Sequence, residues 1–318
     1  MQISLNIEGM SGLNWPRWKR FVREFERMGY DGVFVSDHFT WPFPPDLDSL
    51  ELFVGLTYLA DHTERIHFGS LVSPFSFRDP VFMARQAAAI DDLSGGRMVL
   101  GVGAGWQDRE HNKFGFDLGD MKTRMDRLEE GLEVVTRLTR SRDPVTYHGR
   151  FYRLDEAQLK PRPEQPTRIL VGAKGPRRSL PMVARYADVW NCSAATPDEF
   201  RGYSDRLDAL AVEAGRDPAD IKRTLMLTAF CWRNAAEKED RMSKIRESLP
   251  FFASAPTDEL AEDLAGRAGV MGTPDDVVEK LKEFEAVGVE EVMIQWFSMD
   301  DVEGLGVIGE EVIPHFRE

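Results

Sequence analysis

Short apolar runs alternate with amphipathic helical stretches along nearly the whole of this chain. Eight runs have the length and apolar content of buried strands, at residues 3–7, 33–35, 66–71, 98–102, 169–171, 188–191, 224–230 and 291–296. Helical stretches lie at 15–28, 48–60, 79–93, 122–140, 176–186, 197–214, 275–287 and 306–317. Parallel strands joined by helices form βα units, and eight such units close into a barrel. The pattern therefore predicts an α/β fold, a (βα)8 TIM barrel with insertions; a doubly wound sheet is the alternative, but no position marks the reversal of strand order that it needs.

A weak internal repeat supports the barrel. Residues 25–35 read FERMGYDGVFV, and residues 284–294 read FEAVGVEEVMI. Each segment combines the end of an amphipathic helix, a glycine that can adopt the left-handed cap conformation, and a short strand. Chance similarity of two such units is the alternative, and the helix–glycine–strand unit is expected in either case.

Two segments interrupt the alternation. Residues 144–154 (PVTYHGRFYRL) read as two short strands around a His-Gly turn, an excursion placed to project over the barrel mouth. Residues 232–271 are charged and helix-prone, and we expect them to form a lid or a dimer element between the seventh and eighth units. Because no low-complexity linker divides the chain, residues 1–318 are treated as a single domain that contains both insertions.

Composition excludes several classes of protein. The chain has 40 Lys and Arg residues against 54 Asp and Glu residues, a formal net charge of −14. Nucleic acids and anionic membranes select basic surfaces, so neither is an expected partner. The two cysteines, Cys192 and Cys231, cannot build a disulfide framework and suit a reducing compartment. With no recognisable signal peptide and no run of about 18 apolar residues, we predict a cytoplasmic protein.

In a barrel of this type the functional residues lie on the loops that follow the strands. The loop after the fifth strand, residues 172–178 (GAKGPRR), combines glycines whose amides can approach an anion with three cationic side chains before a predicted helix. This combination predicts a phosphate site; an ordinary turn with surface basic residues is the alternative. The candidate residues are Gly172, Ala173, Lys174, Gly175, Pro176 and Arg177.

A second glycine-rich segment ends the fourth strand. Its glycines, Gly101, Gly103 and Gly105, are separated by single residues and do not match the G-x-G-x-x-G spacing of dinucleotide-binding folds. We expect Gly103, Ala104 and Gly105 to let the backbone approach a flat ligand, with Trp106 as a wall. Tight packing at the barrel rim is the alternative.

Asp37 and His38 form the only Asp-His pair at a predicted strand end. His38 is the candidate catalytic residue, because an imidazole can donate a hydrogen bond or shuttle a proton near neutral pH. A hydrogen bond to a loop carbonyl is its alternative role. The histidine spacing fits no metal motif and no G-x-S-x-G elbow is present, so we expect neither a metal site nor a serine hydrolase.

Several segments, taken in order, resemble those of a known family. They are SDHF (36–39), LVSP (71–74), FRDP (77–80), LSGGR (93–97), LGVGAGW (100–106), YHGRFY (147–152), ARYADVWN (184–191) and GTP (272–274). The series is similar to the bacterial luciferase-like superfamily, in particular to its coenzyme F420-dependent oxidoreductases. The resemblance covers nearly the whole chain, and the stretch from LSGGR to LGVGAGW is its most distinctive part.

The resemblance implies a TIM barrel with a deazaflavin, coenzyme F420, across its mouth. A cis peptide between Leu71 and Val72, beside Ser73, would back the ring, and the phosphate would lie on residues 172–178. Asp37 and His38 map to residues that touch the ring or the substrate. The implied activity is hydride transfer between C5 of the deazaflavin and a small organic substrate. The implied assembly is a homodimer.

Three departures from the family pattern bear on this activity. Lys174 stands in a loop that is often richer in glycine. Trp106 stands where sugar-phosphate dehydrogenases of the family carry an acidic proton donor, so their activity is not expected here. FMN-dependent monooxygenases share much of the scaffold. A monooxygenase that uses reduced FMN and oxygen is therefore the main alternative, and a cofactor-binding barrel without turnover is a further one.

Overall fold

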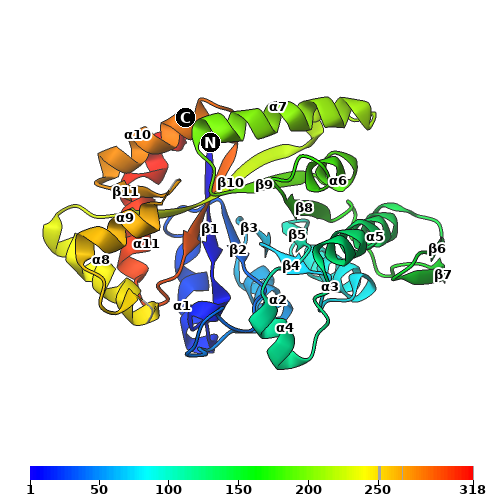
Figure 1. The fold of residues 1–318 in the computed structure, drawn as a ribbon, viewed down its shortest axis with the longest axis horizontal. Coiled ribbons are helices and arrows are strands. Elements are labelled where there is room, and N and C mark those ends of the chain that lie inside the picture. The colour runs from blue at the N-terminus through cyan, green and yellow to red at the C-terminus, as the bar shows by residue number, and fades with distance from the viewer. Residues whose placement is uncertain (250–251, 267, 318) are drawn as a thin grey trace.

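Eight parallel strands close into a barrel in the computed structural model, which describes residues 1–249, 252–266 and 268–317. They are β1 (Gln2–Ile7), β2 (Gly32–Val35), β3 (His67–Ser70), β5 (Met98–Gly103), β8 (Arg168–Gly172), β9 (Val189–Ser193), β10 (Lys222–Cys231) and β12 (Glu291–Trp296). The order around the barrel is β10-β12-β1-β2-β3-β5-β8-β9, and β9 pairs again with β10 (Figure 1). The predicted (βα)8 barrel is confirmed.

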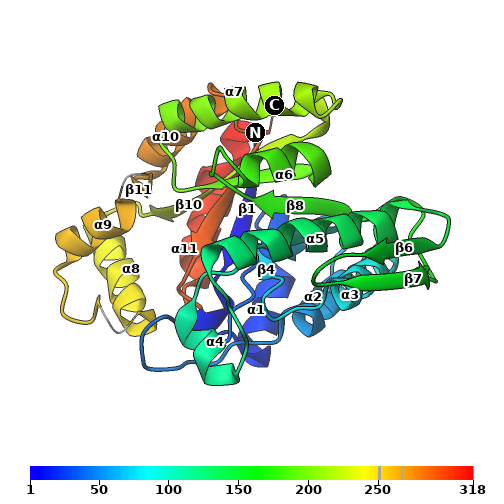
Figure 2. The same ribbon diagram turned by 45° about the vertical axis from the view of Figure 1, so that its right-hand side comes forward.

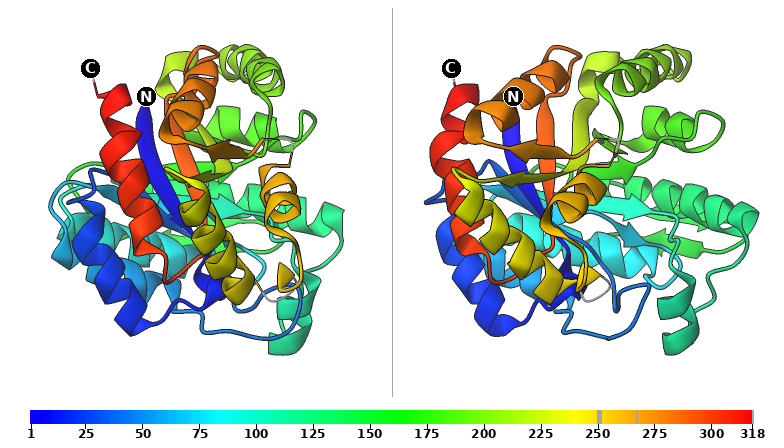
Figure 3. Two further views of the ribbon diagram at one scale, coloured as in Figure 1. Left: turned by 90° about the vertical axis from the view of Figure 1, so that its left-hand side faces the viewer. Right: turned by 60° about the vertical axis from the view of Figure 1, so that its left-hand side comes forward.

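Helices cover the outside of the strands (Figure 3). They are α1 (Trp15–Phe25), α2 (Leu52–His62), α3 (Pro80–Leu93), α5 (Met121–Arg140), α6 (Ser179–Tyr186), α7 (Pro197–Glu213), α10 (Pro274–Glu285) and α11 (Val302–Glu311). Local signals start several of them: the Thr273 hydroxyl and the Asp276 carboxylate form a capping box around Pro274 at the start of α10. None of the helices that the structure describes is long and apolar enough to cross a lipid bilayer.

Several predicted boundaries were wrong. The helix expected at 48–60 begins at Leu52, because the Glu51 carboxylate accepts the Val54 amide hydrogen at 2.8 Å. The helix expected at 306–317 begins at Val302, where Asp301 caps it, and a 3-10 turn at Ile313–Phe316 replaces its end. The strand expected at 66–71 ends at Ser70, and a short strand, β4 (Ser73–Pro74), pairs with β5 after it.

The two insertions lie in different places. Strands β6 (Val145–His148) and β7 (Arg153–Ala157) form an antiparallel hairpin beside α5 (Figure 2). The Glu130 carboxylate of α5 accepts the amide hydrogens of Arg150 and Phe151 at 3.0 and 2.9 Å. The hairpin therefore lies against the outside of α5, and the expectation that it projects over the barrel mouth was wrong.

The second insertion follows β10. It contains α8 (Ala235–Ser248), α9 (Thr257–Ala265) and β11 (Val270–Gly272), and β11 pairs with the end of β10. The Arg241 guanidinium of α8 binds the carboxylate of Asp301 at 2.8 Å, and both side chains are buried. Because Asp301 also caps α11, this ion pair joins the insertion to the last helix of the barrel. An additional short helix, α4 (Asp108–Phe114), follows β5 and was not predicted.

A buried polar cluster closes the barrel at the amino-terminal ends of its strands. Its centre is Glu291 of β12, whose carboxylate accepts hydrogen bonds from His67 Nε2 at 2.7 Å, Lys222 Nζ at 2.6 Å and the Ser4 hydroxyl. A Cβ on Gly32 of β2 would lie 2.5 Å from His67 Nε2, so this glycine makes room for the imidazole. The cluster thereby joins β1, β3, β10 and β12 around one anion.

Burial alone would raise the pKa of Glu291, but the charges and hydrogen bonds of His67 and Lys222 outweigh it and lower that pKa from 4.5 to about 2. The unfolded chain therefore binds more protons than the folded one between these values. We expect the free energy of unfolding to fall by on the order of 3 kcal/mol as the pH drops from about 5 to 2. Urea denaturation at a series of pH values measures this loss.

The loss should be much smaller in Glu291→Gln, which is also less stable at neutral pH because the Lys222 ammonium loses its anion. Glu279→Gln, an exposed position on α10, is the matched control and should retain the wild-type pH dependence. A wild-type pH dependence in Glu291→Gln would show that other carboxylates cause the loss.

Candidate active site

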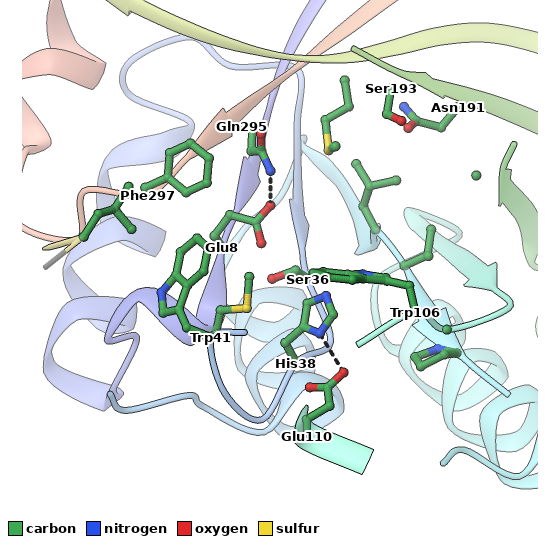
Figure 4. A pocket seen from close by; sticks show the side chains of 18 of the residues that line it. Glu8, Ser36, His38, Trp41, Trp106, Glu110, Asn191, Ser193, Gln295 and Phe297 are labelled. Atoms are coloured by element: carbon green, nitrogen blue, oxygen red, sulfur yellow. Dashed lines mark hydrogen bonds and ion pairs between the residues drawn. The ribbon is translucent and has the colours of Figure 1, made fainter. Parts of the chain in front are cut away.

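A cavity of about 520 Å³ lies at the carboxyl-terminal mouth of the barrel (Figure 4). Loops after the strands and residues of the second insertion line it together. The lining residues are Glu8, Met10, Ser36, His38, Trp41, Leu71, Val72, Pro74, Gly105, Trp106, Glu110, Gly172, Asn191, Ser193, Met226, Leu249, Phe252, Leu264, Gln295 and Phe297. The cavity thus combines apolar walls with two carboxylates and one imidazole.

His38 lies in this cavity and is bound to a buried carboxylate. His38 Nδ1 and Glu110 Oε1 are 2.9 Å apart, and the second oxygen of Glu110 accepts the Phe39 amide hydrogen at 2.9 Å. A carboxylate can only accept here, so Nδ1 carries the hydrogen and Nε2 is turned toward the cavity (Figure 4). The Trp106 ring stands edge-on to the imidazole, with 5.5 Å between centroids.

The charge of Glu110 changes the acidity of His38. Burial alone would lower the pKa of His38, but the hydrogen bond to Glu110 and its charge outweigh burial and raise that pKa above 6.5. Glu8 and Asp37 act in the same direction over a longer distance. The imidazole is therefore suited to hold or release a proton near neutral pH.

The short helix α4 brings Glu110 to His38. Gln107 caps this helix by accepting the Glu110 amide hydrogen at 3.2 Å, and its own amide group donates to the Thr40 carbonyl at 2.7 Å. These bonds join α4 to the loop after β2. The sequence prediction missed Glu110, although a glutamine followed by acidic residues at 108 and 110 is a usable signal for a helix start. Glu110, four residues after Trp106, thus brings a carboxylate to His38.

A second buried carboxylate, that of Glu8, faces the same cavity. Only neutral amides bind it among the described hydrogen bonds: Gln295 Nε2 lies 2.6 Å and Asn6 Nδ2 3.1 Å from its Oε1. Glu8 was also missed, because a single glutamate forms no motif. Its position directly after β1 is the available signal, since the loops after barrel strands carry the chemistry.

Asp37 does not line the cavity, unlike its neighbour His38. Its two oxygens accept hydrogen bonds from Arg78 Nε at 2.8 Å and Arg78 Nη2 at 2.7 Å, and the side chain is buried. This bidentate pair joins the loop after β2 to the segment before α3. The geometry therefore favours a positioning role for Asp37 over the predicted contact with the ring or the substrate.

The residues predicted to back a flat ligand lie at one side of the cavity. The peptide bond between Leu71 and Val72 is cis, as the resemblance implied, and both residues line the cavity. Gly103 makes room for Val72, because a Cβ there would lie 2.7 Å from Val72 Cγ2. At Gly103 the structure therefore supports the alternative interpretation of this glycine-rich segment, tight packing at the barrel rim.

Other predicted members of this group differ in accessibility. Gly105 has a φ of +79° and lines the cavity together with the exposed side chain of Trp106. Ala104 is half-buried. Ser73 is fully buried, and its hydroxyl has no hydrogen-bond partner among the described residues.

The predicted phosphate loop begins at the cavity and leads into α6. Gly172 lines the cavity, and a Cβ there would meet only Val72, at 3.6 Å. Ala173 is buried under the Trp190 indole, which donates to its carbonyl at 2.7 Å. The Gly175 amide donates to the Ser179 hydroxyl at 2.9 Å, so one amide expected to meet an anion is already used.

The cations of this loop divide into two groups. Arg178 binds Asp126 of α5 at 2.8 Å and is therefore neutralised. Lys174 and Arg177 are exposed, with the Lys174 ammonium 3.4 Å from the Ala194 carbonyl, and Pro176 stands exposed between them in sequence. The cationic part of the candidate phosphate site is therefore Lys174 and Arg177.

Comparison with known proteins finds enzymes that are similar to this chain in sequence and in fold. The chain is 28% identical over 319 aligned positions, 92% of each protein, to an F420-dependent glucose-6-phosphate dehydrogenase of Amycolatopsis mediterranei (strain U-32). Its fold matches that of an F420-dependent secondary alcohol dehydrogenase in complex with an F420-acetone adduct, with a TM-score of 0.84, 20% identity, and 100% and 99% of the two chains covered.

The fold is shared with FMN-binding proteins as well. The oxygenating constituent of a type II Baeyer–Villiger monooxygenase of Pseudomonas putida, in complex with FMN, matches with a TM-score of 0.76, 18% identity, and 99% and 98% of the two chains covered. The family model described as luciferase-like monooxygenase matches residues 4–291. The chain therefore belongs to the luciferase-like monooxygenase family.

Proposed function

We propose that this protein is an F420-dependent oxidoreductase that transfers a hydride between C5 of the deazaflavin and a small organic substrate. The observation that carries the proposal is the buried His38–Glu110 pair, which lies in the cavity. Gly172 lines the same cavity and begins the loop that carries the cations Lys174 and Arg177. A hydride transfer needs a proton donor or acceptor near the reacting carbon, and this imidazole is the candidate. The relative that shares 28% identity uses F420.

The residues present fit the cofactor. The Leu71–Val72 backbone lines the cavity and offers a wall for the ring, and the fully buried Ser73 directly follows it in the chain. Lys174 and Arg177 would hold the phosphate, together with Gly172, Ala173, Gly175 and Pro176. When bound, the deazaflavin supplies the hydride acceptor or donor; Trp41 and Trp106 exclude water, and His38 Nε2 holds or moves the proton.

The alternative cofactor is FMN, because FMN-bound monooxygenases share the fold. Fluorescence titration of the purified protein with F420 and with FMN separates the two. We expect F420 to bind more tightly, and preferential binding of FMN would favour the monooxygenase instead. A protein that binds F420 but never changes its redox state with any substrate would be a cofactor-binding barrel without turnover.

A carboxylate placed in the phosphate loop tests the cofactor site. Gly172→Glu should weaken F420 binding at least about 10-fold, because the like charge faces the phosphate while the fold has room for a side chain. Gly202→Glu on α7, where an added Cβ meets nothing within 4 Å, is the matched control and should bind normally. Wild-type affinity in Gly172→Glu would remove the phosphate assignment.

Substitution of Glu110 tests the source of the His38 acidity. In Glu110→Gln the charge that raises the pKa of His38 is lost while burial remains, so this pKa should fall below 6.5. NMR titration of the imidazole follows it directly, and the limb of a pH–rate profile that reports His38 should move to lower pH as well. Asp155→Asn, which breaks the exposed His148–Asp155 pair, should leave the His38 titration unchanged. An unmoved His38 in Glu110→Gln contradicts the assigned role.

We further propose a cytoplasmic homodimer. Val54 on α2 and Phe82 and Leu93 on α3 have exposed fractions of 53%, 67% and 51%, an unusual exposure for large apolar side chains on adjoining helices. The cysteines Cys192 and Cys231 are buried free thiols, as a reducing compartment permits.

Light scattering at micromolar concentration tests the assembly and should give a dimer mass. Phe82→Glu should shift the protein toward monomer, because a charge would be buried in the interface. Val212→Glu on α7, an equally exposed apolar position, should leave the mass unchanged. A monomeric wild-type protein would contradict the proposal.

A further inference from the structure

We infer that the substrate of this cavity is an uncharged, largely apolar molecule with a single hydroxyl or carbonyl group, and that phosphorylated or carboxylated substrates are excluded. The inference rests on the proposed function only in assigning the loop at Gly172 to the cofactor. It differs from what the glucose-6-phosphate dehydrogenase relative would suggest.

The position of the charges divides the cavity into two ends. Strand β8 ends at Gly172, and Glu8 directly follows β1. The two strands lie four positions apart in the barrel order, so the loops after them face each other across the mouth. A cofactor phosphate on Lys174 and Arg177 therefore leaves the end near Glu8, His38 and Phe297 for the substrate.

Among the described residues, the substrate end carries carboxylates and no lysine or arginine. No lysine or arginine occurs among the described residues that line the cavity, whereas two carboxylates do. Glu8 is bound only by neutral amides among the described hydrogen bonds, and it is nearly fully buried. An anionic substrate group would meet this carboxylate in a poorly solvated space, where like charges repel strongly.

Two cations near the substrate end, Arg109 and Lys244, are already bound to other anions. Arg109 binds Asp46 at 2.6 Å and donates to the Trp41 carbonyl, so its charge is already paired with a carboxylate. Lys244 binds Asp240 at 2.6 Å and also lies 3.3 Å from Asp301. Neither side chain lines the cavity, so neither offers a phosphate a partner.

The walls at this end are apolar. The Trp41 and Phe297 rings lie 6.0 Å apart, and the second insertion contributes Leu249, Phe252 and Leu264. These side chains favour binding of a hydrocarbon body and cannot form hydrogen bonds with the hydroxyl groups of a sugar. His38 Nε2, which is turned toward the cavity (Figure 4), is the group that binds the reacting oxygen of the substrate.

Matched pairs of alcohols test the inference by binding. The F420-loaded protein is titrated calorimetrically with 2-octanol and 7-hydroxyoctanoate, with cyclohexanol and 4-hydroxycyclohexane-1-carboxylate, and with glucose 6-phosphate. Each uncharged alcohol should bind at least about 10-fold more tightly than its carboxylate partner, and glucose 6-phosphate should not bind measurably. Tighter binding of either carboxylate or of glucose 6-phosphate, or no binding of any uncharged alcohol, would overturn the inference.

Two variants connect the selectivity to its source. Glu8→Gln should reduce the discrimination against the carboxylates, whereas Glu279→Gln should not change it. Phe252→Ala should weaken binding of the uncharged alcohols about 10-fold and leave F420 affinity unchanged. The F420 titration is a separate measurement, so a protein that does not bind F420 is recognised there. In that case the alcohol pairs are titrated into the FMN-loaded protein, where the same selectivity is expected.

Discussion

One buried carboxylate holds the barrel together at its amino-terminal end. Glu291 receives hydrogen bonds from side chains of three other strands, and its negative charge is stable there only because His67 and Lys222 surround it. The cluster fixes the relative positions of four strands where they enter the barrel. Since each strand then runs rigidly to the opposite end, the positions of the loops after β1, β3, β10 and β12 depend on it.

The opposite end is organised by polar contacts between loops. Asp37 binds Arg78, Gln107 binds the Thr40 carbonyl, and Glu110 binds both His38 and the Phe39 amide. Every one of these contacts involves the loop after β2, so the imidazole is held in one orientation before any ligand arrives. Such preorganisation is what a proton-transferring group requires, because no reorganisation is then needed during the reaction.

The second insertion adds apolar side chains to the cavity at this end of the barrel. The buried Arg241–Asp301 pair anchors α8, and the residues after it supply Leu249, Phe252 and Leu264 to the cavity. In the proposed function, barrel loops hold the cofactor, and the insertion shapes the space for the substrate together with Glu8, His38, Trp41 and Phe297.

The sequence by itself determined the barrel, because the alternation of eight short apolar runs with helices depends on local periodicity alone. It also located His38 and Gly172, since the rule that loops after strands carry function needs only the strand ends, and the resemblance to the family added Leu71 and Val72. Tertiary structure alone decided the partners. Glu110 reaches His38 across 72 positions of sequence, and Asp37 turns to Arg78 across 41. Spacing along a chain does not encode which carboxylate meets which cation; close approach in the folded barrel, where burial makes an unpaired charge costly, makes that choice.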